Sequence, residues 1–195
     1  MRICVLRSGK EYGPQHVQWL ARQVPGLVCL SDVEIDGVPT IRLNHNWPGW
    51  WSKMELFRPD IEEDLLFFDL DTVVIGGIEK LEALEHTTLL SDFYKPNLPA
   101  SGLMLIKNKD KDRVWSDWMV NPEAHMKRCV TREYWGDQGY LRDVLPCKRW
   151  QLELPNRIFS YKAHSLKSVP DGAYVVCFHG IPRPWDVKKS WIPAL

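Results

Sequence analysis

The chain contains a series of short apolar runs, most of about four residues, and this pattern constrains its fold more than any other feature. Apolar runs of this length, bounded by turn residues, are typical of buried strands. We expect strands at residues 3–6, 27–30, 40–43, 65–68, 89–90, 103–106 and 174–178. Apolar spacing predicts helices at 14–24, 51–57 and 114–119. The charged stretch 107–113 is expected to be a solvated turn. Alternating buried strands and helices predict an α/β fold whose sheet is covered on both faces.

Length and composition fit a single domain that spans residues 1–195, since domains have roughly 100–200 residues. The 25 basic and 25 acidic residues cancel, so we expect no nucleic-acid partner, because gripping a phosphate backbone needs a basic excess. No apolar run approaches the roughly 20 residues of a membrane-spanning helix, and the N-terminus lacks the pattern of a signal peptide. Five cysteines without a Cys-x-x-Cys pair indicate neither a disulfide framework nor a zinc site. We therefore expect a cytoplasmic protein.

Two carboxylates directly follow the most apolar of these runs. Residues 65–68 are Leu-Leu-Phe-Phe, and Asp69 and Asp71 come next with one residue between them. In an extended chain, side chains two residues apart point to the same side, so we expect the two carboxylates to converge. Converging carboxylates suit Mg²⁺ or Mn²⁺, and the carboxyl end of a strand is where open α/β sheets bind ligands. The pattern therefore predicts a metal site, although an ordinary polar loop would have the same sequence.

Three further segments carry groups that could complete such a site. Lys53 lies shortly upstream of the acidic pair. Asp137 and Gln138 lie between two glycines, where a backbone can approach a ligand closely. His179 follows a predicted strand, and Arg183 lies in a Pro-rich loop. Carboxylates with one imidazole make a metal site, and the two cations could neutralise a diphosphate bound to that metal.

In their order and spacing, these segments resemble the nucleotide-sugar-dependent glycosyltransferases of glycosyltransferase family 8 and relatives, which include glycogenin and bacterial lipopolysaccharide galactosyltransferases. The resemblance covers nearly the whole chain. It implies a single-domain GT-A-type α/β fold with a mostly parallel central sheet flanked by helices. The implied reaction is transfer of a hexose from a nucleotide diphosphate sugar, a UDP-sugar, to a glycan, lipid or protein acceptor that the sequence does not identify.

The resemblance also assigns roles to individual residues. Asp69 and Asp71 match the metal-binding pair, with Mn²⁺ or Mg²⁺ as the implied cofactor. Asp137 and Gln138 match the pair near the reacting carbon and are, with Lys53, the catalytic candidates. The implied donor-binding residues, with Tyr12 stacked on the nucleoside base, are Leu6, Ser8, Tyr12, Lys53, Asp69, Ser101, Gly102, Gly180 and Arg183.

The resemblance and the local chemistry disagree about the third metal ligand. Alignment on Gly180 puts Cys177 where the family has histidine, whereas His179 directly precedes the glycine. A thiolate is a soft ligand poorly suited to Mg²⁺ or Mn²⁺, so we predict that His179 is the ligand. The two residues are two apart and would face the same side of a strand. The alternative is that His179 bonds a backbone carbonyl and never meets metal.

Two other functions fit parts of the pattern. Residues 68–73 also resemble the Asp-x-Asp-x-Thr strand of haloacid-dehalogenase-like phosphatases, although that strand normally opens its domain. A carbohydrate- or nucleotide-binding module that keeps the site without turnover is the alternative outside enzymes. Nucleotidyl transfer is a poorer fit, because residues 8–10 hardly match a Gly-rich phosphate loop. The reaction that the family resemblance implies, metal-dependent glycosyl transfer with retention at the anomeric carbon, is therefore the prediction.

Overall fold

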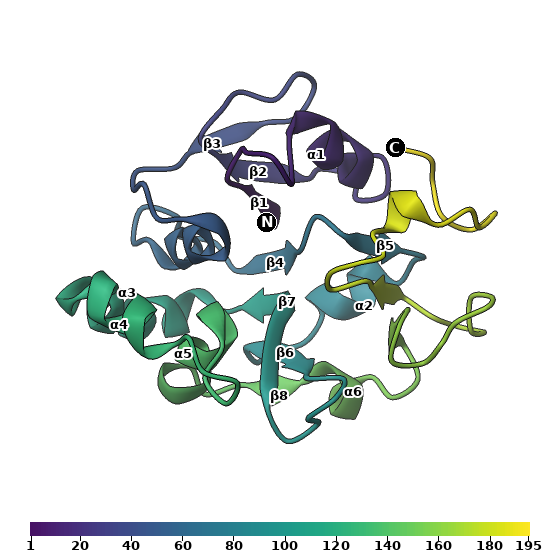
Figure 1. Ribbon diagram of the computed structural model, residues 1–195. Coiled ribbons are helices and arrows are strands. Elements are labelled where there is room, and N and C mark those ends of the chain that lie inside the picture. The colour runs from purple at the N-terminus through teal and green to yellow at the C-terminus, as the bar shows by residue number, and fades with distance from the viewer.

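The computed structural model describes residues 1–195 and is built on a seven-stranded sheet (Figure 1). The order across the sheet is β3-β2-β1-β4-β7-β6-β8. Its strands are β1 (Arg2–Leu6), β2 (Val28–Ser31), β3 (Thr40–Arg42), β4 (Leu65–Phe68), β6 (Thr88–Ser91), β7 (Pro99–Ile106) and β8 (Lys148–Arg149). Strand β7 is antiparallel to both of its neighbours, β4 and β6, whereas the other pairs are parallel. The predicted mostly parallel sheet is confirmed.

Helices connect the strands and flank the sheet. They are α1 (Pro14–Ala21), a 3-10 helix at Gly49–Phe57, α2 (Ile78–Glu82), α3 (Lys111–Val120), α4 (Pro122–Arg128), α5 (Gly136–Val144) and α6 (Trp150–Glu153), with short 3-10 turns at Asn108–Asp110 and Pro184–Asp186. No helix is both long enough and apolar enough to cross a membrane.

The two faces of the sheet carry separate hydrophobic cores. Alternating residues of β4 show the division, since Leu66 and Phe68 join one buried cluster and Leu65 and Phe67 join the other. Helix α1 packs into the first cluster, and α3, α5 and the 3-10 helix at Gly49–Phe57 pack into the second. Because successive strand side chains point to opposite faces, a run of four apolar residues is what a doubly covered strand requires.

A second, smaller sheet completes the fold and is absent from the sequence prediction except for one strand. Its order is β5 (Thr72–Val74), β10 (Val175–Cys177) and β9 (Ile158–Ser160). Strand β10 pairs antiparallel with β5 and parallel with β9. This sheet brings the C-terminal segment against the chain that directly follows β4. It lies at the right in Figure 1, where the yellow segment meets β5.

Three local predictions were wrong. Asp69 and Asp71 do not lie on an extended strand, because the chain turns between β4 and β5 and the Thr72 amide donates to the Asp69 carbonyl at 3.2 Å. The stretch 107–113 is not wholly a solvated turn, since Lys111 begins α3 and is only 1% exposed. The helix predicted at 14–24 ends at Ala21.

Candidate active site

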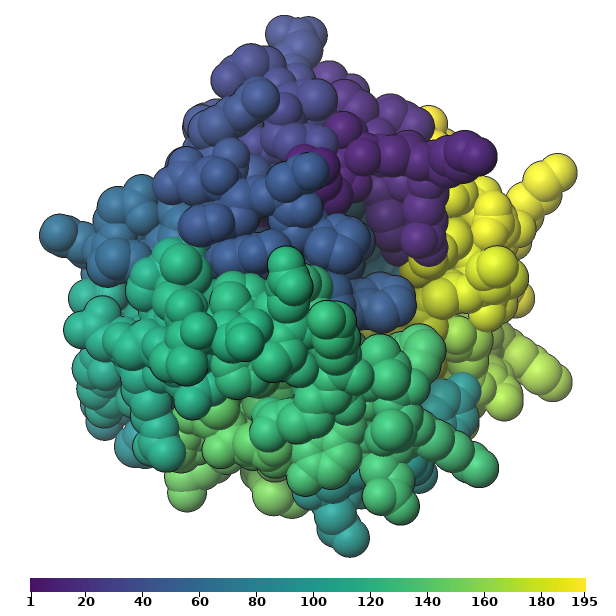
Figure 2. All heavy atoms as spheres, turned by 60° about the vertical axis from the view of Figure 1, so that its left-hand side comes forward, coloured from purple at the N-terminus to yellow at the C-terminus, as the bar shows by residue number.

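A cleft of about 720 Å³ lies where several strands end at one edge of the sheets. The chain that follows β1, β4, β6 and β10 lines it, and because β7 is reversed, the amino end of β7 lines the same edge. Figure 2 shows the N-terminal segment (purple), the segment near residue 50 (blue) and the C-terminal segment (yellow) meeting around a hollow in this face.

Almost all of the residues predicted for the site line this cleft. They are Ser8, Tyr12, Lys53, Asp69, Asp71, Ser101, Gly102, Asp137, Gln138, His179, Gly180 and Arg183. Leu6 is the exception, because its side chain is completely buried in the hydrophobic core at the end of β1. Sequence reasoning missed Phe93, Tyr94 and Trp135, which also line the cleft. Trp50 lines it as well; it belongs to a Trp-rich segment whose rings could stack on sugars or pack a core, and the sequence favoured the core.

Lys53 is the centre of the charge arrangement. Its Nζ lies 2.7 Å from Asp69 Oδ1 and 3.6 Å from Asp137 Oδ2, and its side chain is 13% exposed. Burial alone would lower the pKa of Lys53, but the charges of Asp137 and Asp69 outweigh it and raise the pKa above its usual value. Lys53 is therefore protonated at physiological pH. Asp137 Oδ2 is buried and accepts no hydrogen bond, so its capacity to accept one is unused.

Asp71 receives its partners from the C-terminal segment. Its Oδ2 accepts a hydrogen bond from the Gly180 amide at 3.1 Å and is ion-paired with Arg183, which also pairs with Glu11. Burial and the neighbouring charge of Asp69 raise the pKa of Asp71 to about 6. The φ angle of Gly180 is +103°, a conformation that side chains disfavour. Glycine at this position therefore aims an amide at the carboxylate.

The geometry of Gly102 explains why a small residue follows Ser101. Across the β4–β7 pair, the Asp69 amide donates to the Gly102 carbonyl at 3.0 Å. A Cβ at Gly102 would lie 3.2 Å from Asp69 Oδ2, which is a tight contact. The absence of a side chain at Gly102 thus leaves room for the Asp69 carboxylate where β4 ends beside β7.

His179 lines the cleft, and its ring nitrogen is bonded to Ser160, a residue that does not line the cleft. Its φ angle is +38°, and its Nε2 lies 2.6 Å from the Oγ of the buried Ser160. Its ring stacks on Phe93 with the centroids 5.5 Å apart. Burial and the nearby Lys162 lower the pKa of His179 to about 4, so the imidazole is neutral at physiological pH. Because β10 ends at Cys177, the prediction that residues 177 and 179 share one strand face was wrong.

These contacts test how well the site fits a divalent cation. Asp69 and Asp71 are neighbouring carboxylates, and burial raises the pKa of each because it disfavours the charged form. A cation bound between them would stabilise both negative charges. The structure does not bring His179 into a three-ligand cluster with them. The two carboxylates therefore fit a metal that takes its remaining ligands from elsewhere, and His179 stays a prediction.

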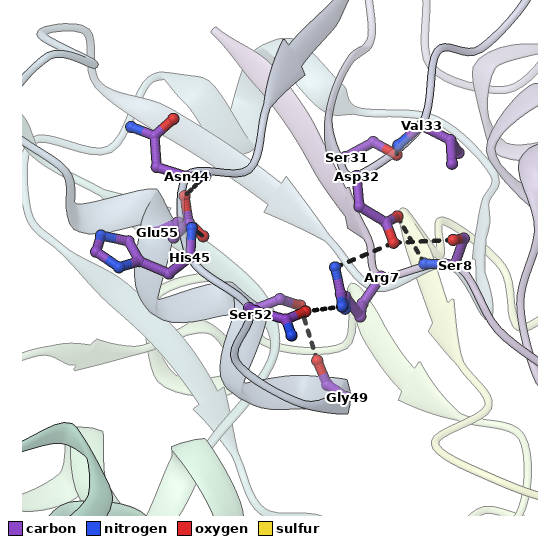
Figure 3. A network of polar contacts seen from close by, with 11 residues as sticks. Arg7, Ser8, Ser31, Asp32, Val33, Asn44, His45, Gly49, Ser52 and Glu55 are labelled. Atoms are coloured by element: carbon purple, nitrogen blue, oxygen red, sulfur yellow. Dashed lines mark hydrogen bonds and ion pairs between the residues drawn. The ribbon is translucent and has the colours of Figure 1, made fainter.

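The turn after β1 is held by polar contacts to the end of β2 (Figure 3). Asp32 accepts hydrogen bonds from the Ser8 amide at 2.8 Å and the Ser8 hydroxyl at 2.9 Å, and it pairs with Arg7 at 3.1 Å. Arg7 also bonds Asn46. Sequence reasoning missed Asp32, although it directly follows a strand, the signal used for Asp69. The Ser8 hydroxyl therefore serves to shape the turn.

Tyr12 lies on the other side of this turn. The Arg183 guanidinium lies 4.9 Å from the centre of the Tyr12 ring. The Trp185 ring meets Tyr12 edge-on, with centroids 6.2 Å apart. Burial and the nearby Asp71 raise the pKa of the Tyr12 hydroxyl, which therefore remains protonated. The aromatic ring is partly buried but still lines the cleft.

Comparison with known proteins identifies the fold. No protein-family model matches the chain, and a search of curated proteins finds no match. Among solved structures, the glycosyltransferase GlyE of Streptococcus pneumoniae TIGR4 is similar over 94% of this chain, with a TM-score of 0.64 and 15% identity. The galactosyltransferase LgtC, in complex with donor and acceptor sugar analogs, is similar over 95% of this chain and 89% of its own, with a TM-score of 0.57 and 12% identity. The bifunctional glycosyltransferase WbbM has a TM-score of 0.54 and 10% identity.

These likenesses confirm the predicted fold class. The chain has the mixed α/β architecture of GT-A-type glycosyltransferases, with a mostly parallel central sheet and flanking helices. The chain spans 56% of the length of GlyE and 46% of WbbM.

Proposed function

We propose that this protein is a metal-dependent glycosyltransferase that moves a hexose from a nucleotide diphosphate sugar to an acceptor, with retention at the anomeric carbon. One observation carries the proposal: Lys53 lies between Asp69 and Asp137, at 2.7 and 3.6 Å, inside a cleft at the strand ends of a GT-A-type fold. Residues 1–195 act as one catalytic domain in this proposal. The five free cysteines support a reducing, cytoplasmic location.

Asp69 and Asp71 would hold the cation, Mn²⁺ or Mg²⁺, with His179 as the third predicted protein ligand. A bound divalent cation would supply Lewis-acid stabilisation of the charge on the departing diphosphate. Both aspartates belong to one turn, so they present oxygen ligands from neighbouring positions of the chain. Hard cations of this kind prefer such oxygen ligands.

Lys53 and Arg183 would share the charge of the diphosphate. Each is now paired with a site carboxylate, Lys53 with Asp69 and Arg183 with Asp71. A cation that binds the two aspartates would replace these pairings and free both side chains for phosphate oxygens. Lysine then acts as a compact point charge, and arginine offers a planar fork suited to phosphate.

Asp137 and Gln138 would position the transferred sugar. Both belong to the first turn of α5, and Gly139 lets this turn pack closely, since a Cβ there would lie 2.9 Å from the Tyr134 backbone. The Oδ2 of Asp137 accepts no hydrogen bond and lies 3.6 Å from Lys53 Nζ, so it retains the capacity to accept a hydrogen bond from a sugar hydroxyl. Positioning of this kind contributes to catalysis by keeping the reacting atoms close and aligned.

The donor would lie across the cleft from the turn at Ser8 and Tyr12 to Ser101, Gly102 and Gly180. Tyr12 supplies an aromatic face for the base, and uridine is the proposed nucleoside. Binding by stacking on a partly buried ring combines apolar area with a fixed orientation. The Gly180 amide, which donates to Asp71, would hold that carboxylate in place beside the diphosphate.

A panel of nucleotides and nucleotide sugars, each with and without Mn²⁺, tests the proposal by thermal shift and by detection of sugar transfer or donor hydrolysis. Ligand at roughly 100 times its dissociation constant adds roughly 2.7 kcal/mol of stability, which is readily measured. We expect UDP and a UDP-sugar to stabilise the protein in the presence of Mn²⁺.

The same panel separates the alternatives. Release of phosphate from simple phosphoesters, without any nucleotide-sugar binding, would support the phosphatase. Mn²⁺-dependent binding without turnover of any donor would support a non-catalytic module.

A further inference from the structure

A second cavity of about 550 Å³ adjoins the cleft. Four residues line both cavities: Asp92, Tyr94, Trp135 and Gln138. Gln138 thus stands at the boundary, next to the predicted positioning residue Asp137. A molecule in the second cavity would therefore reach the proposed sugar end of the cleft beside Gln138.

The second cavity carries an excess of available positive charge. Its cations are Lys95, Arg132 and Arg142, and its carboxylates are Asp92 and Glu133. One Asp92 oxygen already accepts the amides of Tyr94 and Lys95 at 2.7 and 2.9 Å. The Arg132 guanidinium makes no ion pair or hydrogen bond in the structure, and its side chain is on an exposed residue. A negatively charged ligand group in the cavity could form an ion pair with the Arg132 guanidinium.

Arg142 is also placed to bind a negatively charged ligand group. Its guanidinium lies 3.7 Å from the centre of the Tyr134 ring, and its Nη1 donates to the Glu133 carbonyl at 3.1 Å. Its one nearby carboxylate, Asp143, is 3.6 Å away. Stacking and the backbone bond restrict the side chain while leaving part of the planar fork free for a carboxylate or phosphate.

Exposed aromatic rings border the two cavities. Tyr94 is 66% exposed, Trp135 is 52% exposed and Trp50 is 48% exposed. The rings of Trp50 and Trp135 lie 5.9 Å apart. Large aromatic side chains that remain exposed beside a pocket are typical of binding sites rather than of cores. Their flat faces suit the apolar C–H faces of a sugar ring.

We infer that the second cavity binds the acceptor, and that the acceptor is a carbohydrate with a carboxylate or a phosphate group. This inference rests on the proposed transferase function and adds the chemical class of the second substrate. Arg132 and Arg142 bind the anionic group, and Trp135 and Tyr94 contact the sugar ring. Gln138 then lies between the acceptor and the donor sugar.

Three probes test the inference by saturation-transfer NMR and calorimetric titration, with UDP and Mn²⁺ filling the donor cleft. They are a disaccharide containing glucuronic acid, its glucose counterpart, and the same neutral disaccharide with a phosphate. We expect the anionic probes to bind at least roughly tenfold more tightly than the neutral one, since charged hydrogen bonds are the stronger ones. Whichever anionic probe binds more tightly identifies the source of the charge.

Variants show whether the preference comes from this cavity. Arg142→Ala should reduce the preference for anionic probes by roughly tenfold and Arg132→Ala by less, with little change for the neutral probe. Arg132 has no partner whose loss would disturb folding, so its variant keeps the test valid if Arg142→Ala unfolds. Arg113→Ala, on an exposed position of α3 outside both cavities, is the matched control.

Equal binding of neutral and anionic probes would overturn the inference, and so would a preference that survives both cavity variants. If UDP binds with Mn²⁺ but no probe binds, the inference fails and the proposed donor site stands. If the anionic probes bind but no nucleotide does, the anionic carbohydrate site stands and the proposed function fails.

Discussion

Two largely buried lysines show how differently two regions of the molecule use charge. Lys53, in the cleft, lies 2.7 Å from one aspartate and 3.6 Å from another. Lys111, at the start of α3, donates to the backbone carbonyls of Ile61 and Glu63, each at 2.6 Å. Carboxylates raise the pKa of Lys53 above its usual value, whereas burial lowers the pKa of Lys111 to about 8.

The difference separates a candidate binding site from a structural connection. Lys111 donates hydrogen bonds to two backbone carbonyls, so its partners belong to the fold itself. Around Lys53 the cleft holds Asp69, Asp71 and Asp137, and one oxygen of Asp137 accepts no hydrogen bond. Partly satisfied buried polar groups are costly in a native structure, and they cluster where a ligand completes them.

The largest expected effect is the loss of the metal. Asp69→Asn and Asp71→Asn should each abolish Mn²⁺-dependent nucleotide binding while the protein stays folded, because each removes a carboxylate ligand and keeps the side-chain size. Calorimetric titration of UDP with and without Mn²⁺ measures this. Asp64→Asn is the matched control, because Asp64 lies at the opposite end of β4 and pairs with Lys107. Undiminished Mn²⁺-dependent binding in both site variants would refute the metal assignment.

A smaller but still large effect is expected for Lys53. Lys53→Met should lower sugar transfer by roughly 10²–10³-fold, as removal of one preorganised electrostatic group does in other active sites, and should weaken nucleotide-sugar binding more than uridine binding. Tyr12→Ala should show the reverse bias, because it removes the stacking face. Lys111→Met is the control that removes a buried lysine elsewhere. Equal losses for uridine and nucleotide sugar in Lys53→Met would contradict its place at the diphosphate.

His179 combines the two situations, because it lines the cleft, as Lys53 does, and is also bonded to a buried group of the fold, as Lys111 is. We expect His179→Ala to raise the Mn²⁺ concentration needed for transfer and to cut transfer severely, and Cys177→Ser to remain largely active. Ser160, which holds Nε2 at 2.6 Å, orients the ring in either case. Titration of activity against Mn²⁺ in the variants decides between the roles. An unchanged Mn²⁺ requirement in His179→Ala would make the histidine structural.

The smallest effect on activity, and a distinct effect on stability, is expected for Lys111. The pKa of its ammonium falls from 10.5 to about 8 in the folded protein. Between these values the unfolded chain binds more protons, so the contribution of Lys111 to stability rises with pH across that window. Chemical denaturation at pH 7 to 10 should show a slope that Lys111→Met lacks, while nucleotide binding is unchanged. A slope that persists in the variant would show that other groups cause it.

The pattern of strands could be predicted well because burial on both faces leaves a local signature. Residues 65–68 are a strand as predicted, and Asp69 and Asp71 face the cleft although their i, i+2 rationale was wrong. Helix α5 was missed because two glycines stand in its first turn, where local propensity opposes a helix. Its formation depends on packing of Tyr140 and Leu141 into the core.

The short apolar runs were enough to predict an α/β sheet, and the acidic pair at the end of one strand was predicted with them, because strand period and strand-end chemistry are properties of neighbouring residues. Most of the other predicted residues that line the cleft were predicted from the family resemblance. The pairing of Lys53 with Asp137, the contact of His179 with Ser160 and the burial of Lys111 were not readable in this way. Each joins segments that are distant in the chain. Such contacts depend on how the second sheet and the helices pack, and no local pattern specifies that packing.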